Sequence, residues 1–253
     1  LINQSVMPIL DNKSSDFFFE AKSDNVETFK TIIDLATRRI PNFLNTSIDG
    51  MKLQILAPLK AGVCGVENLN KALQDKVNPE SMRKKEIKLG INTLREGDKI
   101  MHTANNYNLT WKRKIEGSQH EEEGKGVFNG DIGYIIDIDN QTGEVKVKFE
   151  DGRVALYPRS ELNQISLAYA ITIHKSQGSE FDVVIIPIFV GPALILTKNL
   201  IYTAVTRAKK MVILVGDKIA LARMIKNTHT AKRYTLLKDF LLDESDKMKK
   251  LFG

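Results

Sequence analysis

The sequence has a single cysteine and no long apolar stretch, and both absences exclude classes of protein. Cys64 is the only cysteine among 253 residues, so an internal disulfide framework and a multi-cysteine zinc site are excluded. A reducing, cytoplasmic setting is the default expectation for such a chain. No apolar run approaches the roughly 20 residues that span a bilayer, so no membrane partner is expected. The chain opens on Leu1 without a signal-peptide pattern, which fits an excised fragment, a processed chain or a disordered start.

What the sequence does contain is a globular composition with an excess of positive charge. Hydrophobic residues make up 42% of the chain and charged residues 27%, which is enough apolar material for a sizeable core. The formal net charge is +6 and the isoelectric point is about 9.2. This excess favours a polyanionic partner such as nucleic acid, although a merely basic surface would give the same numbers.

Both ends of the chain alternate between short apolar strands and segments of helical period. This rhythm predicts a parallel α/β sheet with right-handed crossovers. We expect strands at residues 16–20, 53–57, 183–187 and 211–215. We expect helices at residues 25–40, through Leu69, Leu73 and Val77, and at 167–176, 198–209 and 218–226. Pro41 and Pro79 should end the first two helices.

Between these parts, from Glu96 to Leu162, the pattern has period two. Candidate strands are residues 99–103, 133–137, 144–149 and 154–157, and Asp151-Gly152 predicts a hairpin between the last two. Several short strands in one segment suit a small barrel, while the polar stretch 110–125 is interpreted as an exposed, mobile loop. The expected division is a two-part α/β domain (1–94 and 164–227), an inserted barrel (95–163) and a C-terminal tail (228–253) that forms a terminal helix or a fraying end.

The segment most specific for chemistry is Thr172-Ile173-His174-Lys175-Ser176-Gln177-Gly178-Ser179-Glu180-Phe181. It is expected to form a turn at the edge of the parallel sheet, where ligands bind in such folds. Donors that suit a phosphodiester chain come from Thr172, His174, Lys175 and Ser176. Gly178 lets phosphate oxygens approach the backbone, and Glu180 can accept from a ribose hydroxyl. The plainer interpretations are a buried, hydrogen-bonded His174 and a Gly178 that only caps a turn.

A second segment is Tyr202-Thr203-Ala204-Val205-Thr206-Arg207-Ala208-Lys209, predicted to lie on a helix that leads into a strand. Arg207 can present a planar, permanently charged fork to a phosphate. A cation aimed at the charge that develops on a transferred phosphoryl group raises the rate about 10³–10⁵-fold. The plainer interpretation is a helix-end cation that offsets the helix dipole.

These two segments resemble motifs V and VI of superfamily 1 helicases in their RecD-like form. Two further regions agree with the resemblance. The motif IV region is similar to Leu56-Ala57-Pro58-Leu59-Lys60 with Gly65 and Leu69-Asn70. The inserted barrel of RecD-like proteins resembles Gly97-Asp98-Lys99-Ile100, Asn105-Asn106-Tyr107-Asn108 and Val127-Phe128-Asn129-Gly130-Asp131-Ile132-Gly133. The likeness covers about residues 1–217, in order along the chain.

The resemblance implies a RecA-like motor domain with an inserted Src-homology-like β-barrel. The parent activity would be an ATP-dependent DNA helicase, moving 5′ to 3′, that acts in recombination and repair. Arg207 would be the arginine finger. The nucleotide would face Gln177, Gly178 and Glu180, and Lys60 would be a looser match, because relatives usually have a basic pair where this chain has Lys60-Ala61. Single-stranded DNA would contact Thr172, His174, Lys175 and Ser176, together with Asn106, Tyr107 and Asn129 of the barrel.

The cofactors implied by the resemblance need residues that this sequence does not contain. It has no G-x-x-x-x-G-K-[ST] phosphate loop and no acidic strand end paired with one. ATP and Mg²⁺ would therefore be held mainly by an N-terminal motor domain of the same polypeptide, and the chain alone is expected to be inactive. Nuclease subunits are a further candidate partner. No metal site is expected, because Asp98, Asp131 and Asp151 stand beside glycines as turn acids.

Two alternatives stay open. One is a non-catalytic nucleic-acid-binding module, in which the barrel binds and the α/β part is scaffold. The other is a relaxase-linked or Pif-like helicase domain. Asn105–Tyr107 and Trp111 could stack on bases, while partial burial or disorder of Trp111 in its loop is the plainer interpretation.

Overall fold

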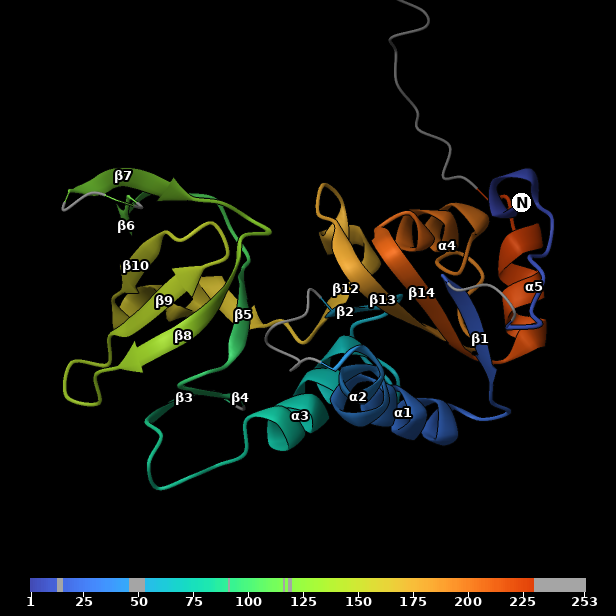
Figure 1. Cartoon of the computed structure of the whole chain (residues 1–253), viewed down its shortest axis with the longest axis horizontal. Helices are drawn as coiled ribbons and strands as arrows, with labels where there is room; N and C mark the ends of the chain where they lie inside the picture. The colour runs from blue at the N-terminus through green and yellow to red at the C-terminus, as the bar shows by residue number, and fades with distance from the viewer. Residues whose placement is uncertain (13–15, 46–52, 91, 116, 118–119, 230–253) are drawn as a thin grey trace, which may run out of the picture.

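The computed structural model describes residues 1–12, 16–45, 53–90, 92–115, 117 and 120–229, and it contains two large sheets (Figure 1). The first sheet is parallel, in the order β1-β14-β13-β2-β12. Its strands are β1 (Phe17–Ala21), β2 (Leu53–Ala57), β12 (Ala170–Thr172), β13 (Phe181–Ile188) and β14 (Ala208–Gly216). The predicted parallel α/β sheet is confirmed.

Helices cover both faces of the parallel sheet, because successive residues of its strands are apolar. Val184 and Ile186 of β13 share a core with α4 (Lys198–Val205) and α5 (Lys218–Lys226). Val183 and Ile185 point the other way, to the core shared with α1 (Asn25–Asp34) and α3 (Val66–Val77). A continuous apolar strand is typical of a parallel sheet that is buried on both sides.

The second sheet is antiparallel and has the order β11-β5-β8-β9-β10-β6-β7. Its strands are β5 (Lys99–His102), β6 (Asn106–Lys114), β7 (Glu121–Val127), β8 (Ile132–Ile138), β9 (Val145–Phe149), β10 (Val154–Tyr157) and β11 (Ile165–Leu167). In β9, Val145, Val147 and Phe149 are buried while the lysines between them are exposed. This alternation is the period-two signal of the sequence, and it confirms the strands predicted for the small barrel. The antiparallel sheet is called the barrel below.

The first helix does not end at Pro41 as predicted. After α1 the chain forms a π-helical turn (Leu35–Arg39) and then α2 (Ile40–Leu44). The Ile40 N–H bonds to the carbonyl of Leu35, five residues earlier. The widened turn ends just before Pro41, where an α-helix would need an N–H that proline does not have.

The expectation of a mobile loop at residues 110–125 is wrong over the described part of that stretch. β6 and β7 form a hairpin whose facing charges pair, Lys112 with Glu123 at 2.6 Å and Arg113 with Glu122. The strands are polar because both of their faces are largely exposed, so the alternation of apolar residues that marks a strand is missing. The feature of the sequence that indicates this hairpin is its charge pattern, because opposite charges face each other across the two strands.

The expected helix at residues 167–176 is also wrong. The segment contains the end of β11, the short strand β12 and a 3₁₀ turn (Ile173–Ser176). β12 pairs with β2, and the backbone N–H of Ala170 donates to Asn70 Oδ1 at 2.8 Å. Its apolar residues are buried on both sides of the sheet, and over three residues this burial cannot be distinguished from a helical pattern.

A buried polar network joins the two sheets at Asp98, which lies in a turn as predicted but has an enclosed carboxylate. Asp98 is 0% exposed, and each of its oxygens accepts two hydrogen bonds. Oδ1 accepts from Asn78 Nδ2 at 2.7 Å and from the Tyr169 hydroxyl at 3.0 Å. Oδ2 accepts from Gln74 Nε2 at 2.6 Å and from the backbone N–H of Arg95 at 2.7 Å. The carboxylate therefore ties the start of the antiparallel sheet to α3 and to the return path toward β12.

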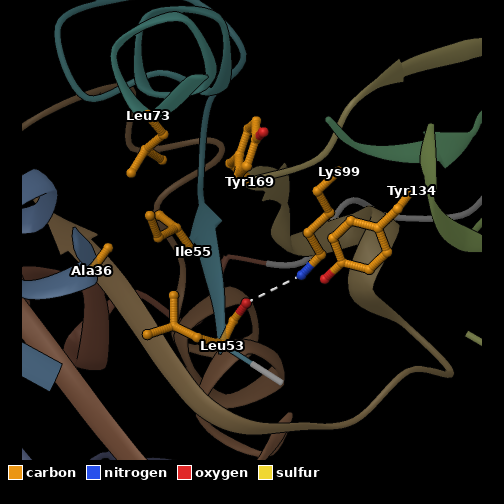
Figure 2. Close-up of a pocket in the computed structure, with 7 residues that line it drawn as sticks. All are labelled: Ala36, Leu53, Ile55, Leu73, Lys99, Tyr134 and Tyr169. Atoms are coloured by element: carbon orange, nitrogen blue, oxygen red, sulfur yellow. Dashed lines mark hydrogen bonds between the residues drawn. The ribbon is translucent and has the colours of Figure 1, made fainter. Parts of the chain in front are cut away.

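Lys99 makes a second contact across this junction (Figure 2). Its ammonium donates to the Leu53 carbonyl at 3.2 Å and to Gln54 Oε1 at 3.1 Å, both on β2. The small cavity beside it, about 20 Å³, is lined by Ala36, Leu53, Ile55, Leu73, Lys99, Tyr134 and Tyr169. A water needs about 10–15 Å³, so this cavity has room for about one water and is too small to be a ligand site.

His102 gives the antiparallel sheet a pH-sensitive point. Its ring is 0% exposed, Nδ1 lies 3.0 Å from the Tyr157 hydroxyl, and Nε2 has no partner among the described residues. Burial is the main cause that lowers the pKa of His102, and the charges of Asp131 and Glu161 oppose it. A base with a lowered pKa is neutral in the fold, so its stabilising contribution is complete above the unfolded pKa of about 6.5 and is lost as the pH falls below that value.

We therefore expect the free energy of unfolding to fall between pH 7 and pH 5.5, by up to about 1.4 kcal/mol per pH unit from this group. His102→Asn keeps an amide opposite Tyr157 and cannot titrate, so its profile should be flatter over the same range. Urea unfolding followed by the fluorescence of Trp111, the one tryptophan, measures both profiles. Parallel profiles would show that His102 has no such role.

None of the described helices is long and apolar enough to cross a bilayer. The predicted terminal helix or fraying end after Thr228 lies almost wholly outside the described residues.

Candidate functional site

The segment Thr172–Phe181 leads from the carboxyl ends of the parallel strands to their amino ends. These two sides of the sheet are called the carboxyl edge and the amino edge. Thr172 ends β12 at the carboxyl edge, and its Oγ1 accepts from the backbone N–H of Lys175 at 3.4 Å, which caps the 3₁₀ turn. Phe181 begins β13 at the amino edge. The segment runs from strand to strand, not from a helix as predicted, and passes from one edge of the sheet to the other.

At the carboxyl edge the segment brings Lys175 close to Lys60. Lys60 follows β2, which pairs with β12. Burial lowers the pKa of Lys175 below its ordinary value, and the nearby charge of Lys60 lowers it further. No carboxylate pairs with either lysine among the residues that the structure describes. Two neighbouring cations without a counter-charge form a site that favours an anion such as phosphate.

The backbone around Lys60 is fixed by the start of α3. The carbonyls of Leu59 and Lys60 accept from the N–H groups of Val66 and Glu67, each at 3.1 Å. A Cβ at Gly65 would lie 2.5 Å from the Ala61 carbonyl carbon, so only glycine permits this close loop. The sequence therefore sets the position from which Lys60 approaches Lys175.

At the amino edge the segment contacts Arg207. Arg207 lies in the turn between α4 and β14 and not on a helix as predicted, because the helix expected over residues 198–209 ends at Val205 and β14 begins at Ala208. Nη1 donates to the Ser179 carbonyl at 3.2 Å and Nε to the Thr203 carbonyl at 3.3 Å. The Arg207 carbonyl accepts from the Phe181 N–H at 2.9 Å. The two segments singled out in the sequence are thus hydrogen-bonded to each other.

The guanidinium of Arg207 is half-buried and meets carbonyl and hydroxyl oxygens, not a carboxylate, within the described part of the chain. Its bond to Thr203 satisfies a carbonyl in the last turn of α4, which is what the helix-end interpretation expects. Because no anion neutralises the charge, the guanidinium remains able to attract a phosphate.

Of the residues predicted to face a nucleotide, Gln177 and Gly178 are exposed beside this arginine contact. Gly178 has φ +89°, and no atom lies within 4 Å of where a Cβ would be, so its backbone is open to an approaching group. Glu180 is exposed too, and its carboxylate pairs with Lys209 at 3.0 Å. Glu180 can accept from a sugar hydroxyl only if it shares or leaves this ion pair.

The structure corrects two of the predicted DNA contacts, and it places one predicted nucleotide contact, Lys60, beside a predicted DNA contact. Ser176 is 0% exposed and its hydroxyl donates to the Ile173 carbonyl at 2.7 Å, so it does not face a ligand. The Asn106 amide donates to Glu161 and Gln164, and its oxygen accepts two backbone N–H groups, so it braces the barrel. Lys60, predicted to bind nucleotide, lies with Lys175 at the carboxyl edge, opposite to the edge of Arg207.

The remaining predicted contacts are accessible. His174 is exposed next to Lys175, and Thr172 is half-buried. On the antiparallel sheet Tyr107 is 68% exposed, and Asn129 is exposed in the turn that follows β7. Sequence reasoning missed Phe128, which packs edge-to-face on Tyr107. The available signal was a phenylalanine directly before an Asn-Gly turn, because small and polar residues dominate turns.

Neither a metal site nor a reactive thiol is found in the part of the chain that the structure describes. No group of three or more His, Cys, Asp or Glu side chains there could hold a metal ion. Cys64 is buried, its thiol donates to the Asn25 carbonyl at 3.2 Å, and burial raises its pKa to about 11. This thiol is a packing residue.

Two protein-family models match the chain. Residues 69–149 match the model described as an ATP-dependent RecD-like DNA helicase SH3 domain. Residues 167–215 match a UvrD-like helicase C-terminal domain. The second match includes both segments that meet at Arg207.

Similar proteins have the same character. The chain is 30% identical over 183 residues to an ATP-dependent RecD2 DNA helicase of Deinococcus radiodurans, covering 71% of this chain and 22% of that protein. It is 35% identical over 185 residues to the RecBCD enzyme subunit RecD of Buchnera aphidicola subsp. Acyrthosiphon pisum, covering 70% of this chain and 27% of that one. The chain therefore spans about a quarter of the length of these relatives.

Among solved structures, the chain is similar to a Pif1 helicase from Bacteroides in complex with ADP-AlF3 and ssDNA. The TM-score is 0.43 and the identity 19%, over 87% of this chain and 50% of that one.

Proposed function

Since the chain belongs to the RecD-like helicases, we propose that it is the second motor half of an ATP-dependent DNA helicase. In this role it supplies an arginine finger, Arg207, and part of a track for single-stranded DNA. The nucleotide lies between this half and an N-terminal motor domain of the same polypeptide. Nuclease subunits are further proposed partners, because several relatives are named as subunits of the RecBCD enzyme.

One observation carries the proposal: a single short segment joins two cationic sites. Lys175 and its neighbour Lys60 lie at the carboxyl edge of the sheet, and Ser179 accepts from Arg207 at the amino edge. A shift of Arg207 toward a phosphate therefore acts directly on the segment that carries Lys175. This arrangement suits a motor, in which nucleotide state must change the grip on a polyanion.

The residues present fit one side of ATP. Arg207 would hold the γ-phosphate oxygens, the open backbone at Gly178 would approach the phosphates, and Gln177 and Glu180 would reach the polar parts of the nucleotide. Bound ATP with Mg²⁺ supplies the phosphoryl group, with the metal held by the other motor half. The role of this chain is to place positive charge where negative charge grows during transfer.

The same observation weighs against a purely non-catalytic DNA-binding module. Such a module needs cations along a nucleic-acid path, but it has no need for a second cation hydrogen-bonded to the far end of the same segment. Arg207 also lies at the opposite edge from the lysine pair, where it would add little to a continuous DNA path.

The DNA part of the proposal predicts a change in salt dependence. Each phosphate contact on a single strand contributes about 0.7 to the slope of log K against log salt. Lys60→Ala and Lys175→Ala should each weaken binding of the chain to an oligo-dT strand and reduce the slope by about that amount. Fluorescence anisotropy titrations between low and physiological salt measure both quantities.

Lys210→Ala is the matched control, because Lys210 is an exposed lysine whose charge is held by Asp182 at 3.0 Å. It should leave the slope unchanged. Equal slopes for all four proteins, or tight binding to duplex DNA that salt does not weaken, would contradict the proposed track.

A further inference from the structure

We propose that Tyr107 and Phe128 form a stacking platform for an unpaired base of single-stranded DNA. The proposal rests on the proposed function and adds to it a contact with bases, separate from the phosphate contacts of the lysine pair. The two rings come from different turns of the barrel, the start of β6 and the residue after β7. In Figure 1 the turn between β7 and β8 lies on the side of the barrel that faces the parallel sheet.

Both rings are exposed although they are apolar and adjacent. Tyr107 is 68% exposed and Phe128 is 43% exposed. Their centroids lie 5.7 Å apart with an interplanar angle of 74°, an edge-to-face contact. This geometry satisfies the ring edges and leaves the face of at least one ring free to stack on a flat partner.

The turns that carry the rings are braced by side-chain hydrogen bonds. The N–H of Asn129 donates to Asn105 Oδ1, and the N–H of Phe128 donates to Asp131 Oδ2, each at 3.0 Å. Arg153 in turn pairs with Asp131 at 2.8 Å. The backbone that carries the rings is therefore ordered before a ligand arrives, which reduces the entropy lost on binding.

Exposed amide side chains flank the rings, and the nearby cation Arg153 is already paired with Asp131. Asn105, Asn108 and Asn129 are exposed beside the pair. Amide groups match the hydrogen-bonding edges of bases, whereas phosphate contacts need charge. Two rings alone are too small for a stable protein interface, which buries about 1,200 Å² or more. A nucleobase is the ligand whose size and chemistry fit.

Trp111 does not offer the same site. It is half-buried, its ring would collide with any Cβ at Gly124, and Arg113 and Arg153 lie 5.9 and 5.7 Å from its centroid. Its faces are therefore occupied within the barrel, and the platform is confined to the Tyr107–Phe128 pair.

The test compares a strand with bases against one without them. Tyr107→Ala should weaken binding of the full chain to oligo-dT by about 5- to 150-fold, the effect of one stacked base. Binding to an abasic strand of equal length should be the same for the variant and the wild type. The slope against salt should also stay unchanged, because no phosphate contact is removed.

Matched variants separate stacking from damage to the fold. Tyr107→Trp keeps a ring, so it should retain the affinity for oligo-dT and add a fluorescence signal that oligo-dT quenches and the abasic strand does not. Phe43→Ala removes an aromatic ring that is 75% exposed on α2, and it should change nothing. An equal loss of affinity for both strands, or no loss for either while the lysine variants still change the slope, would overturn the platform and leave the proposed function standing. Absence of any binding by the wild type would instead overturn the proposed function.

Discussion

Arg207→Ala should lower the single-strand-stimulated ATPase of the full-length protein by about 10³-fold or more, with ATP binding retained. Arg207 is half-buried, meets carbonyl and hydroxyl oxygens alone within the described residues, and lies beside the exposed Gly178 turn. Its charge is therefore available to a phosphate. Stabilising the charge that develops in transfer lowers the barrier without tightening the ground state, so kcat should fall far more than KM changes.

Two variants make this measurement specific. Arg207→Lys keeps the charge but loses the planar fork, so it should recover only a small part of the rate. Lys210→Ala removes a nearby exposed cation that Asp182 already neutralises, and it should leave turnover unchanged. If Arg207→Ala keeps normal turnover, Arg207 is only a helix-end cation, and the non-catalytic binding module becomes the better interpretation.

The chemistry of the two segments could be read from the sequence because it is local. Each is a short run in which small, polar and cationic residues stand side by side, and local order is preserved in any fold. The proximity of Lys60 to Lys175 could not be read in this way. It depends on β12 pairing with β2, and the sequence of a three-residue strand does not distinguish it from a helix turn.

The same limit explains the other errors. The β6–β7 hairpin is exposed on both faces, so the apolar alternation that reveals strands is absent. Ser176 has the chemistry of a phosphate ligand, but burial removed it from the surface. Asp98 stands beside a glycine in the sequence, and only the packing of α3 against the barrel shows that its carboxylate is enclosed.

Asp98→Asn should destabilise the protein by about 2–5 kcal/mol, since it leaves buried donors without acceptors. In the native protein each oxygen accepts two hydrogen bonds, from Asn78 and Tyr169 and from Gln74 and the Arg95 backbone. An asparagine has one oxygen, so its NH₂ group would face two donors in either orientation. Burial raises the pKa of Asp98, and the four donors oppose that rise. The free energy of unfolding from urea titrations measures the loss.

Asp137→Asn is the appropriate comparison, because Asp137 is a carboxylate 54% exposed that pairs with Lys85 at 2.7 Å. Removing an exposed ion pair changes stability by about 0–1 kcal/mol. The position of Asp98 adds a second consequence: its partners lie on α3 and on the path to β12, so its loss should loosen the barrel from the parallel sheet. Protease digestion should then cut between the two sheets before either unfolds. Equal stability of the two variants, with no early cleavage, would mean that Lys99, the other hydrogen bonds of α3 and apolar packing hold the barrel without Asp98.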